Sequence, residues 1–308
     1  MLNEFKSICK MSQKDLKEYV AKQLEETHKK VIVDDGFVYA QGKFPVLLVA
    51  HMDTVHKKLP KFFLYDTEKK ALSSPQGIGG DDRCGVYMIF EVIKKYNCSV
   101  LFCEDEEIGM VGAGKFVKSD LAKDLQFNYI IEFDRRGSND AVFYDCDNPE
   151  FEEFITKEFY QTSFGSFSDI STIAPALGCA AVNLSCGYYN AHTKDEYVVM
   201  EEMENSIYVT CKILDRTTDE DKFEYIEAEH SYRYSDFGWD DYFGYDYKSL
   251  RNKDMYYMFE YIDENGDSQW WDTLAANRDE AVGAFCIDNP RIPYIDIIDI
   301  CVDEYDYY

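Results

Sequence analysis

Histidine and carboxylate side chains recur in five short segments, and together these segments could supply the ligands of two metal ions. The segments are residues 51–55 (HMDTV), 79–83 (GGDDR), 104–107 (EDEE), 131–134 (IEFD) and 191–196 (AHTKDE). Zinc binds imidazole nitrogen and carboxylate oxygen readily, and a catalytic zinc site keeps one position open for water. Two such ions about 3.5–4 Å apart can hold a hydroxide between them and polarise a carbonyl group. The residue types therefore predict hydrolytic chemistry.

Apolar runs typical of buried strands precede these segments. Residues 46–50 form a continuous apolar run that ends at His51, and residues 99–103 and 128–133 repeat the design before the next two acidic segments. Between the first two runs, apolar residues with helical spacing predict a helix after Gly85. Alternating strands and helices predict a three-layer α/β fold, with a mostly parallel central sheet flanked by helices. Sites in such sheets form at the carboxyl ends of the strands, where these segments fall.

The composition changes near residue 216, and this change predicts two domains. Residues 1–216 carry all five segments and are expected to form the catalytic domain, with no inserted lid domain. Residues 217–308 contain 24 Asp or Glu against 7 Lys or Arg, and all three Trp. We expect a small acidic, aromatic-rich α+β domain there, with strands at 255–262 and 292–302, a helix starting at Asn277 and an irregular tract at 231–247. Exposed aromatic residues in this part could form a partner surface or cover a site entrance.

The charge and the cysteines limit the class of protein. The net charge is −27, with 59 acidic and 32 basic residues, which argues against a nucleic-acid partner. The N-terminus lacks an apolar run typical of a signal peptide, and no later segment resembles a membrane span. The ten cysteines contain no Cys-x-x-Cys pair, so reduced thiols and a cytoplasmic location are expected.

The motifs resemble those of the co-catalytic, binuclear zinc exopeptidases, a superfamily that includes peptidase T-like tripeptidases and zinc aminopeptidases. The resemblance rests on His-x-Asp after a strand, Gly-Gly-Asp-Asp-Arg-x-Gly, Glu-Glu-x-Gly, a later Asp and His-Thr-Lys-Asp-Glu, and it covers roughly residues 10–214. Family members often carry a lid or dimerisation domain, and the spacings 53–81 and 134–168 leave no room for one. The dimers and cages of such relatives are therefore not expected, and the oligomeric state stays open.

The resemblance implies a role for each site residue. It implies His51 and Asp134 on one metal and Glu107 and His192 on the other, with Asp82 bridging both. It also implies that Asp53 orients His51 through the second ring nitrogen and that Glu106 is the general base. The chemistry agrees, because among these side chains a carboxylate can bridge two ions, whereas an imidazole offers one lone pair to one metal. In an extended strand, residues 51 and 53 also point to the same side.

Three further residues are candidates for binding substrate. Ser168 and Asp169 lie where the family often has a substrate-contacting pair, although a helix N-cap explains them equally well. Arg135 follows the Asp ligand and could meet a substrate carboxylate.

The expected function is that of a metal-dependent exopeptidase, an aminopeptidase that hydrolyses short peptides through a metal-bridged hydroxide. Two divalent ions are expected, Zn²⁺ first and Co²⁺ or Mn²⁺ as alternatives. A deacylase or amidohydrolase acting on a small N-acyl compound could use the same metals. A non-catalytic binding protein that has kept the fold is the third alternative.

Overall fold

The chain forms two compact units, residues 1–229 and 230–308. The structure, a computed structural model, describes residues 2–157, 159–165, 167–228, 255–262, 268–275, 285 and 297–303. The boundary lies later than the predicted one, because residues after 216 pack on the first unit. The Phe223 ring lies 5.1 Å from the rings of Phe151 and Phe154, and the backbone at Glu224 and Glu227 forms β-bridges with the first unit.

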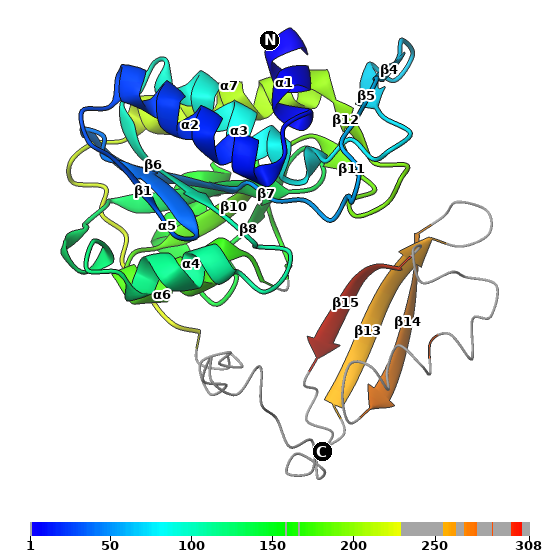
Figure 1. The fold of residues 1–308 in the computed structure, drawn as a ribbon. Helices are drawn as coiled ribbons and strands as arrows, with labels where there is room; N and C mark the ends of the chain where they lie inside the picture. The colour runs from blue at the N-terminus through cyan, green and yellow to red at the C-terminus, as the bar shows by residue number, and fades with distance from the viewer. Residues whose placement is uncertain are drawn as a thin grey trace, which may run out of the picture. The chain divides into compact units, whose positions relative to one another are not determined.

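An eight-stranded sheet forms the middle layer of the first unit (Figure 1). Its strands, in spatial order, are β1 (Val31–Asp34), β2 (Phe37–Ala40), β6 (Cys98–Cys103), β3 (Phe44–His51), β7 (Tyr129–Arg135), β10 (Ala181–Ser185), β8 (Asp140–Val142) and β9 (Gln161–Ser163). The four central strands, β6, β3, β7 and β10, are parallel to one another. The predicted α/β fold with a mostly parallel sheet is thus confirmed.

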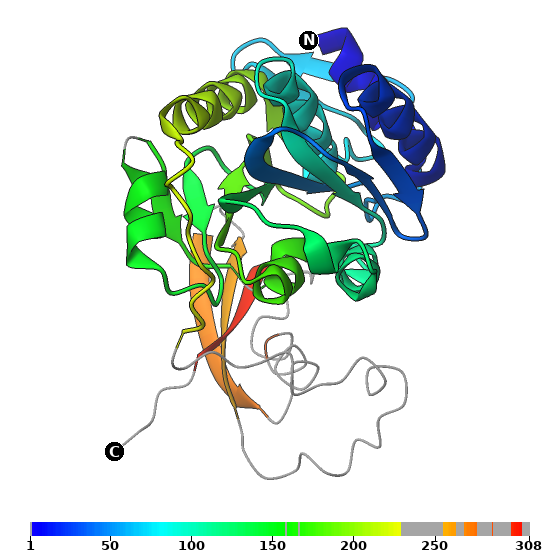
Figure 2. The ribbon, with the colours of Figure 1, turned by 90° about the vertical axis from the view of Figure 1, so that its left-hand side faces the viewer.

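Helices cover both faces of this sheet (Figures 1 and 2). On one face lie α1 (Leu2–Cys9), α2 (Gln13–Thr27), α3 (Gly80–Ile93) and α7 (Met200–Arg216), and on the other lie α4 (Val111–Lys118) and α6 (Asp169–Leu177). The helix α5 (Pro149–Thr156) shares a core with α3, and the short 3-10 helix η1 (Ala122–Asp124) follows α4.

The central strands are apolar on both sides because each side faces a separate core. In β3, Val46, Leu48 and Ala50 belong to the core under α3, whereas Leu47 and Val49 belong to the core under α4 and α6. This alternation with period two explains the continuous apolar runs of the sequence. None of the helices in the described ranges is both long and apolar enough to cross a bilayer.

A second, small sheet stands beside the main one and was not anticipated from the sequence. Its strands, in order, are β11 (Tyr188–Tyr189), β12 (Tyr197–Val199), β5 (Ala71–Ser73) and β4 (Leu64–Asp66), all antiparallel. The pairing of β12 with β5 brings the segment before β12 next to the segment that leads from β5 into α3. These two segments carry His192 and Asp81.

The second unit contains an antiparallel sheet of β14 (Ser268–Ala275), β13 (Met255–Ile262) and β15 (Ile297–Asp303). The predicted strand at 255–262 is confirmed, and the predicted strand at 292–302 matches β15 in part. Phe259 and Phe285 are fully buried and stack with centroids 5.1 Å apart. The expected helix at Asn277 and the tract 231–247 lie outside the described residues.

Candidate metal centre

Five side chains with metal-ligand chemistry meet at the carboxyl ends of the central strands. His51 ends β3, Asp134 lies near the end of β7, Glu107 follows β6, Asp81 lies at the start of α3, and His192 precedes β12. They form two groups, one of His51, Asp81 and Asp134, the other of Asp81, Glu107 and His192. Within each group the possible ligand atoms all lie within 4.8 Å of one another. Asp81 belongs to both.

The two oxygens of Asp81 face different histidines. Its Oδ1 lies 3.0 Å from His51 Nε2, and its Oδ2 lies 3.0 Å from His192 Nε2. Asp134 Oδ1 lies 3.4 Å from His51 Nε2, and Glu107 Oε2 lies 3.1 Å from His192 Nε2. This geometry suits a carboxylate that serves two cations at once.

The shared position is therefore Asp81 and not Asp82, which corrects the sequence prediction by one residue. Asp82 is fully buried, and its carboxylate accepts hydrogen bonds from the backbone N–H groups of His51 (3.3 Å) and Gly85 (2.8 Å). The backbone angles at Asp81 (φ −81°, ψ 104°) and Asp82 (φ −118°, ψ 47°) are not helical, and Asp81 and Asp82 are joined by a cis peptide bond. The two carboxylates have different partners: Asp81 faces the two histidines, and Asp82 binds the backbone at the end of β3 and in the first turns of α3.

Asp53 connects the histidine of the first group to the acidic loop after β6. Its Oδ1 lies 3.1 Å from His51 Nδ1 and accepts a hydrogen bond from the Glu106 N–H (3.0 Å). Its Oδ2 accepts one from the Glu107 N–H (3.0 Å). The predicted contact between Asp53 and His51 is present, and the same carboxylate also fixes the backbone of both glutamates.

Asp134 is held by neighbours that the sequence did not indicate. The side chain of Asn183 accepts a hydrogen bond from the Asp134 N–H (2.8 Å) and donates one to its carbonyl oxygen (3.1 Å). The Tyr188 hydroxyl donates to Asp134 Oδ1 at 3.3 Å. Both residues belong to the strands β10 and β11, so only the fold brings them to Asp134.

The three predicted substrate contacts have other environments in the structure. The Ser168 hydroxyl is buried and donates to Asp134 Oδ2 at 2.8 Å. Asp169 is fully buried at the first turn of α6, and burial raises its pKa to about 7. The Arg135 guanidinium pairs with Asp140 at 3.2 Å. In this arrangement Ser168 supports a candidate ligand, Arg135 pairs with Asp140, and Asp169 is a member of neither ligand group.

The electrostatics of the site favour bound positive charge. Burial alone would lower the pKa of His51, but Asp134, Asp53 and Asp81 raise that pKa well above its usual value. Burial alone would also lower the pKa of His192, but the carboxylates of Asp81 and Glu107 raise that pKa above its usual value. Burial raises the pKa of Glu107, and one of its oxygens, Oε1, is buried without a hydrogen-bond partner. Imidazole nitrogens and spare carboxylate oxygens are a donor set that fits zinc.

One side of the centre is open to solvent. The His192 side chain is 55% exposed, whereas that of His51 is 1% exposed. Glu106, the predicted base, is buried beside the first group, and burial together with the charge of Asp134 raises its pKa well above the usual value. A substrate could therefore approach from the side of His192.

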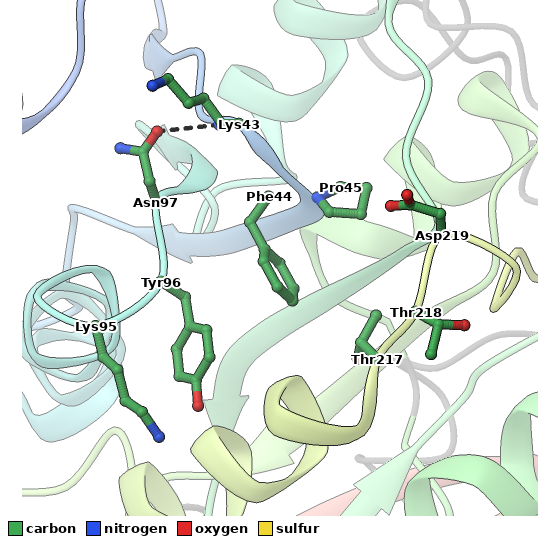
Figure 3. Close-up of a pocket in the computed structure, with 9 residues that line it drawn as sticks. All are labelled: Lys43, Phe44, Pro45, Lys95, Tyr96, Asn97, Thr217, Thr218 and Asp219. Atoms are coloured by element: carbon green, nitrogen blue, oxygen red, sulfur yellow. Dashed lines mark hydrogen bonds between the residues drawn. The ribbon is translucent and has the colours of Figure 1, made fainter.

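A pocket of about 580 Å³ lies at the opposite edge of the sheet (Figure 3). It is lined by residues at the start of β3 and β6 and after α7, among them Phe44, Tyr96, Asn97 and Thr217. The Lys43 N–H donates to Asn97 Oδ1 at its rim (3.0 Å). No residue of either ligand group lines this pocket, so the pocket is separate from the candidate metal centre.

Comparisons with known proteins find similarity in structure only. No protein-family model matches the chain, and no curated protein matches its sequence. The aminopeptidase PepT from Bacillus cereus matches 70% of this chain and 97% of its own, with a TM-score of 0.59 and 14% identity. A tripeptidase from Staphylococcus aureus matches 69% and 96%, with a TM-score of 0.55 and 12% identity. An aminopeptidase from the archaeon Desulfurococcus kamchatkensis matches 71% and 95%, with a TM-score of 0.56 and 15% identity. The α/β fold of this chain is therefore shared with these two aminopeptidases and this tripeptidase.

Proposed function

We propose that this chain is a metal-dependent aminopeptidase that acts on short peptides. The observation that carries the proposal is the pair of histidine–carboxylate groups that share Asp81 at the carboxyl edge of the sheet. The fold shared with aminopeptidases and a tripeptidase supports it. His51, Asp81 and Asp134 would hold one divalent ion, and Asp81, Glu107 and His192 the other. Zn²⁺ is the proposed ion because imidazole and carboxylate are its usual ligands here.

The metals would supply Lewis acidity, lowering the pKa of a water molecule and polarising the scissile carbonyl group. The protein's own groups do the rest. Glu106 accepts a proton from the attacking water on its carboxylate and returns it to the nitrogen of the leaving amine. Asp53 keeps the His51 ring in place and fixes the backbone beside Glu106. The surplus of carboxylates around the centre favours a substrate that carries a free α-ammonium group.

Hydrolysis assays with matched variants test this proposal. Metal-free protein would be reloaded with Zn²⁺, Co²⁺ or Mn²⁺, and release of amino acids would be measured from dipeptides and tripeptides with free or acetylated N-termini. Glu106→Gln removes the proton acceptor without removing a ligand, so we expect metal binding to persist and the rate to fall about 100- to 10,000-fold. Glu104→Gln is the control, because Glu104 lies in the same acidic run but binds Lys17 and the Gly36 N–H.

The outcomes separate the alternatives. Hydrolysis of peptides with free N-termini, lost in Glu106→Gln and kept in Glu104→Gln, supports an aminopeptidase. Activity confined to acetylated substrates would replace this proposal with a deacylase. Tight binding of two metals with no hydrolysis of either substrate class would indicate a binding protein. Full activity of Glu106→Gln would show that the assigned base is wrong.

A further inference from the structure

Glu196 has a fully buried carboxylate that belongs to neither ligand group. Its Oε1 accepts a hydrogen bond from the Asp81 N–H at 2.9 Å. Its Oε2 accepts one from the Gly79 N–H at 2.9 Å and lies 2.6 Å from His56 Nε2. A carboxylate accepts only, so Nε2 of His56 carries the hydrogen in this contact. One buried side chain therefore receives three donors, two of them from the backbone of the loop that carries Asp81.

The small sheet explains how Glu196 reaches this loop. Tyr197, the first residue of β12, pairs with Ser73, the last residue of β5. The residue before Tyr197 therefore lies beside the chain that leaves β5 toward Gly79 and Asp81. Glu196 also follows His192 by four positions in the sequence. It consequently ties together two segments that both contribute to the second ligand group.

The loop depends on this support because the helix does not provide it. The backbone at Asp81 is not helical, and the N–H groups at a helix start have no partner within the helix. The packing around the loop is also close. A Cβ added at Gly77 would lie 2.2 Å from the His56 ring, and one added at Gly80 would lie 2.8 Å from Val198. The direction of the Asp81 carboxylate is thus set by contacts with Glu196 and its neighbours.

We infer that Glu196, held by His56, is a positioning residue that aims Asp81 at both histidines and so sets the affinity of both metal sites together. This inference rests on the metal centre proposed above. Replacing Glu196 should thus weaken both metal sites, whereas replacing a ligand of one group alone, such as Glu107, should weaken one site. Partners that orient metal ligands typically change affinity by about 10- to 100-fold when they are replaced.

Metal titration of four variants tests the inference without any substrate. Zn²⁺ binding to the metal-free full-length chain would be measured by competition with a chromophoric chelator, and the fold by circular dichroism and thermal melting. In Glu196→Gln, one oxygen becomes an amide donor that faces an N–H donor, so we expect both Zn²⁺ equivalents to bind about 10- to 100-fold more weakly. His56→Ala should weaken both in the same direction. His56→Gln should restore most of the affinity, because its amide nitrogen can take the place of Nε2.

His28→Gln is the matched control. His28 is also buried, and its Nε2 contacts the Cys98 carbonyl oxygen (2.8 Å) at the start of β6, the edge of the sheet remote from the site. It should leave both affinities unchanged. If Glu196→Gln does not fold, His56→Ala decides the matter, because it leaves the backbone hydrogen bonds of Glu196 in place.

Two results would overturn the inference: wild-type affinity at both sites in Glu196→Gln and His56→Ala, or weakening at one site alone. A wild-type chain that binds no Zn²⁺ would overturn it as well, together with the proposed centre. A chain that shows the expected metal affinities but hydrolyses nothing would refute the proposed activity and leave this inference standing.

Discussion

Replacing Asp81 with Asn gives the sharpest test of the shared carboxylate. Asn keeps the size of the side chain, but it has one oxygen and no charge. In the structure, the two oxygens of Asp81 lie 3.0 Å from His51 Nε2 and 3.0 Å from His192 Nε2. A single oxygen can serve only one of the two groups, and the negative charge is lost to both. Both ions should therefore bind more weakly, whereas a change at Glu107 or Asp134 removes a ligand from one group only.

The structure gives the size of this effect. An ion enclosed by atoms that lie within 4.8 Å of one another is less than 4.8 Å from the Asp81 oxygen of its group. With an effective dielectric constant of about 20, one unit charge at that distance contributes about 3.5 kcal/mol, and a divalent ion about 7 kcal/mol. Metal binding also ends the contacts of Asp81 with His51 and His192, which we take to offset about half of that value. A net loss of about 3.5 kcal/mol at each ion weakens binding roughly 300-fold.

The assay is metal content after dialysis, followed by chelator competition for each equivalent. Asp82→Asn is the control, because Asp82 accepts backbone hydrogen bonds from His51 and Gly85 instead of facing the two histidines. That variant should keep two ions and lose about 1–3 kcal/mol of stability, measured by urea unfolding. Two ions retained with wild-type affinity in Asp81→Asn, or both lost in Asp82→Asn, would refute the assignment of the shared ligand.

Three further predictions follow from the same structure. Because the pKa values of His51 and His192 are raised, a bound metal ion must displace protons from both rings near neutral pH. Zn²⁺ affinity should therefore rise from pH 6 to pH 8, with proton release measured by calorimetry in buffers of different ionisation enthalpy. An affinity that does not change with pH would contradict these shifts. Gly85→Ala would place a Cβ 2.1 Å from the Phe133 carbonyl oxygen, so we expect a loss of about 1–3 kcal/mol or more in thermal or urea unfolding, and wild-type stability would show that this contact relaxes freely. A chain ending at Glu229 should keep the fold of the first unit and both metal sites; loss of metal from a folded truncation would place a ligand in residues 230–308.

The sequence by itself determined the central layer of the fold. Strands buried on both faces are largely apolar, so the mostly apolar runs at 46–50, 99–103 and 128–133 identified β3, β6 and β7. Their parallel arrangement follows from the alternation with helices, and it places the residues at their ends on one edge. For that reason the candidate ligands His51, Glu107 and Asp134 could be selected before their positions were known.

Elements with weak local signals were not determined in this way. The helix α4 contains Gly112 and Gly114, and glycine is a poor helix former. The strands of the small sheet have only two or three residues each, too few to show a period. The boundary near residue 216 was placed too early, because the packing of Phe223 against the first unit is a long-range contact that composition does not reveal.

The choice between Asp81 and Asp82 was decided by the tertiary structure alone. Two adjacent aspartates have the same chemistry, and no spacing rule separates them. What separates them is the backbone of the loop, which is fixed by Glu196 from a segment more than a hundred residues away in the chain. Glu196 belongs to the predicted segment 191–196, but nothing in the sequence assigned a role to it or to His56, because their hydrogen bonds exist only once the small sheet has brought these segments together. The sequence supplied the donor atoms of the site, and the long-range hydrogen bonds decided which of them face one another.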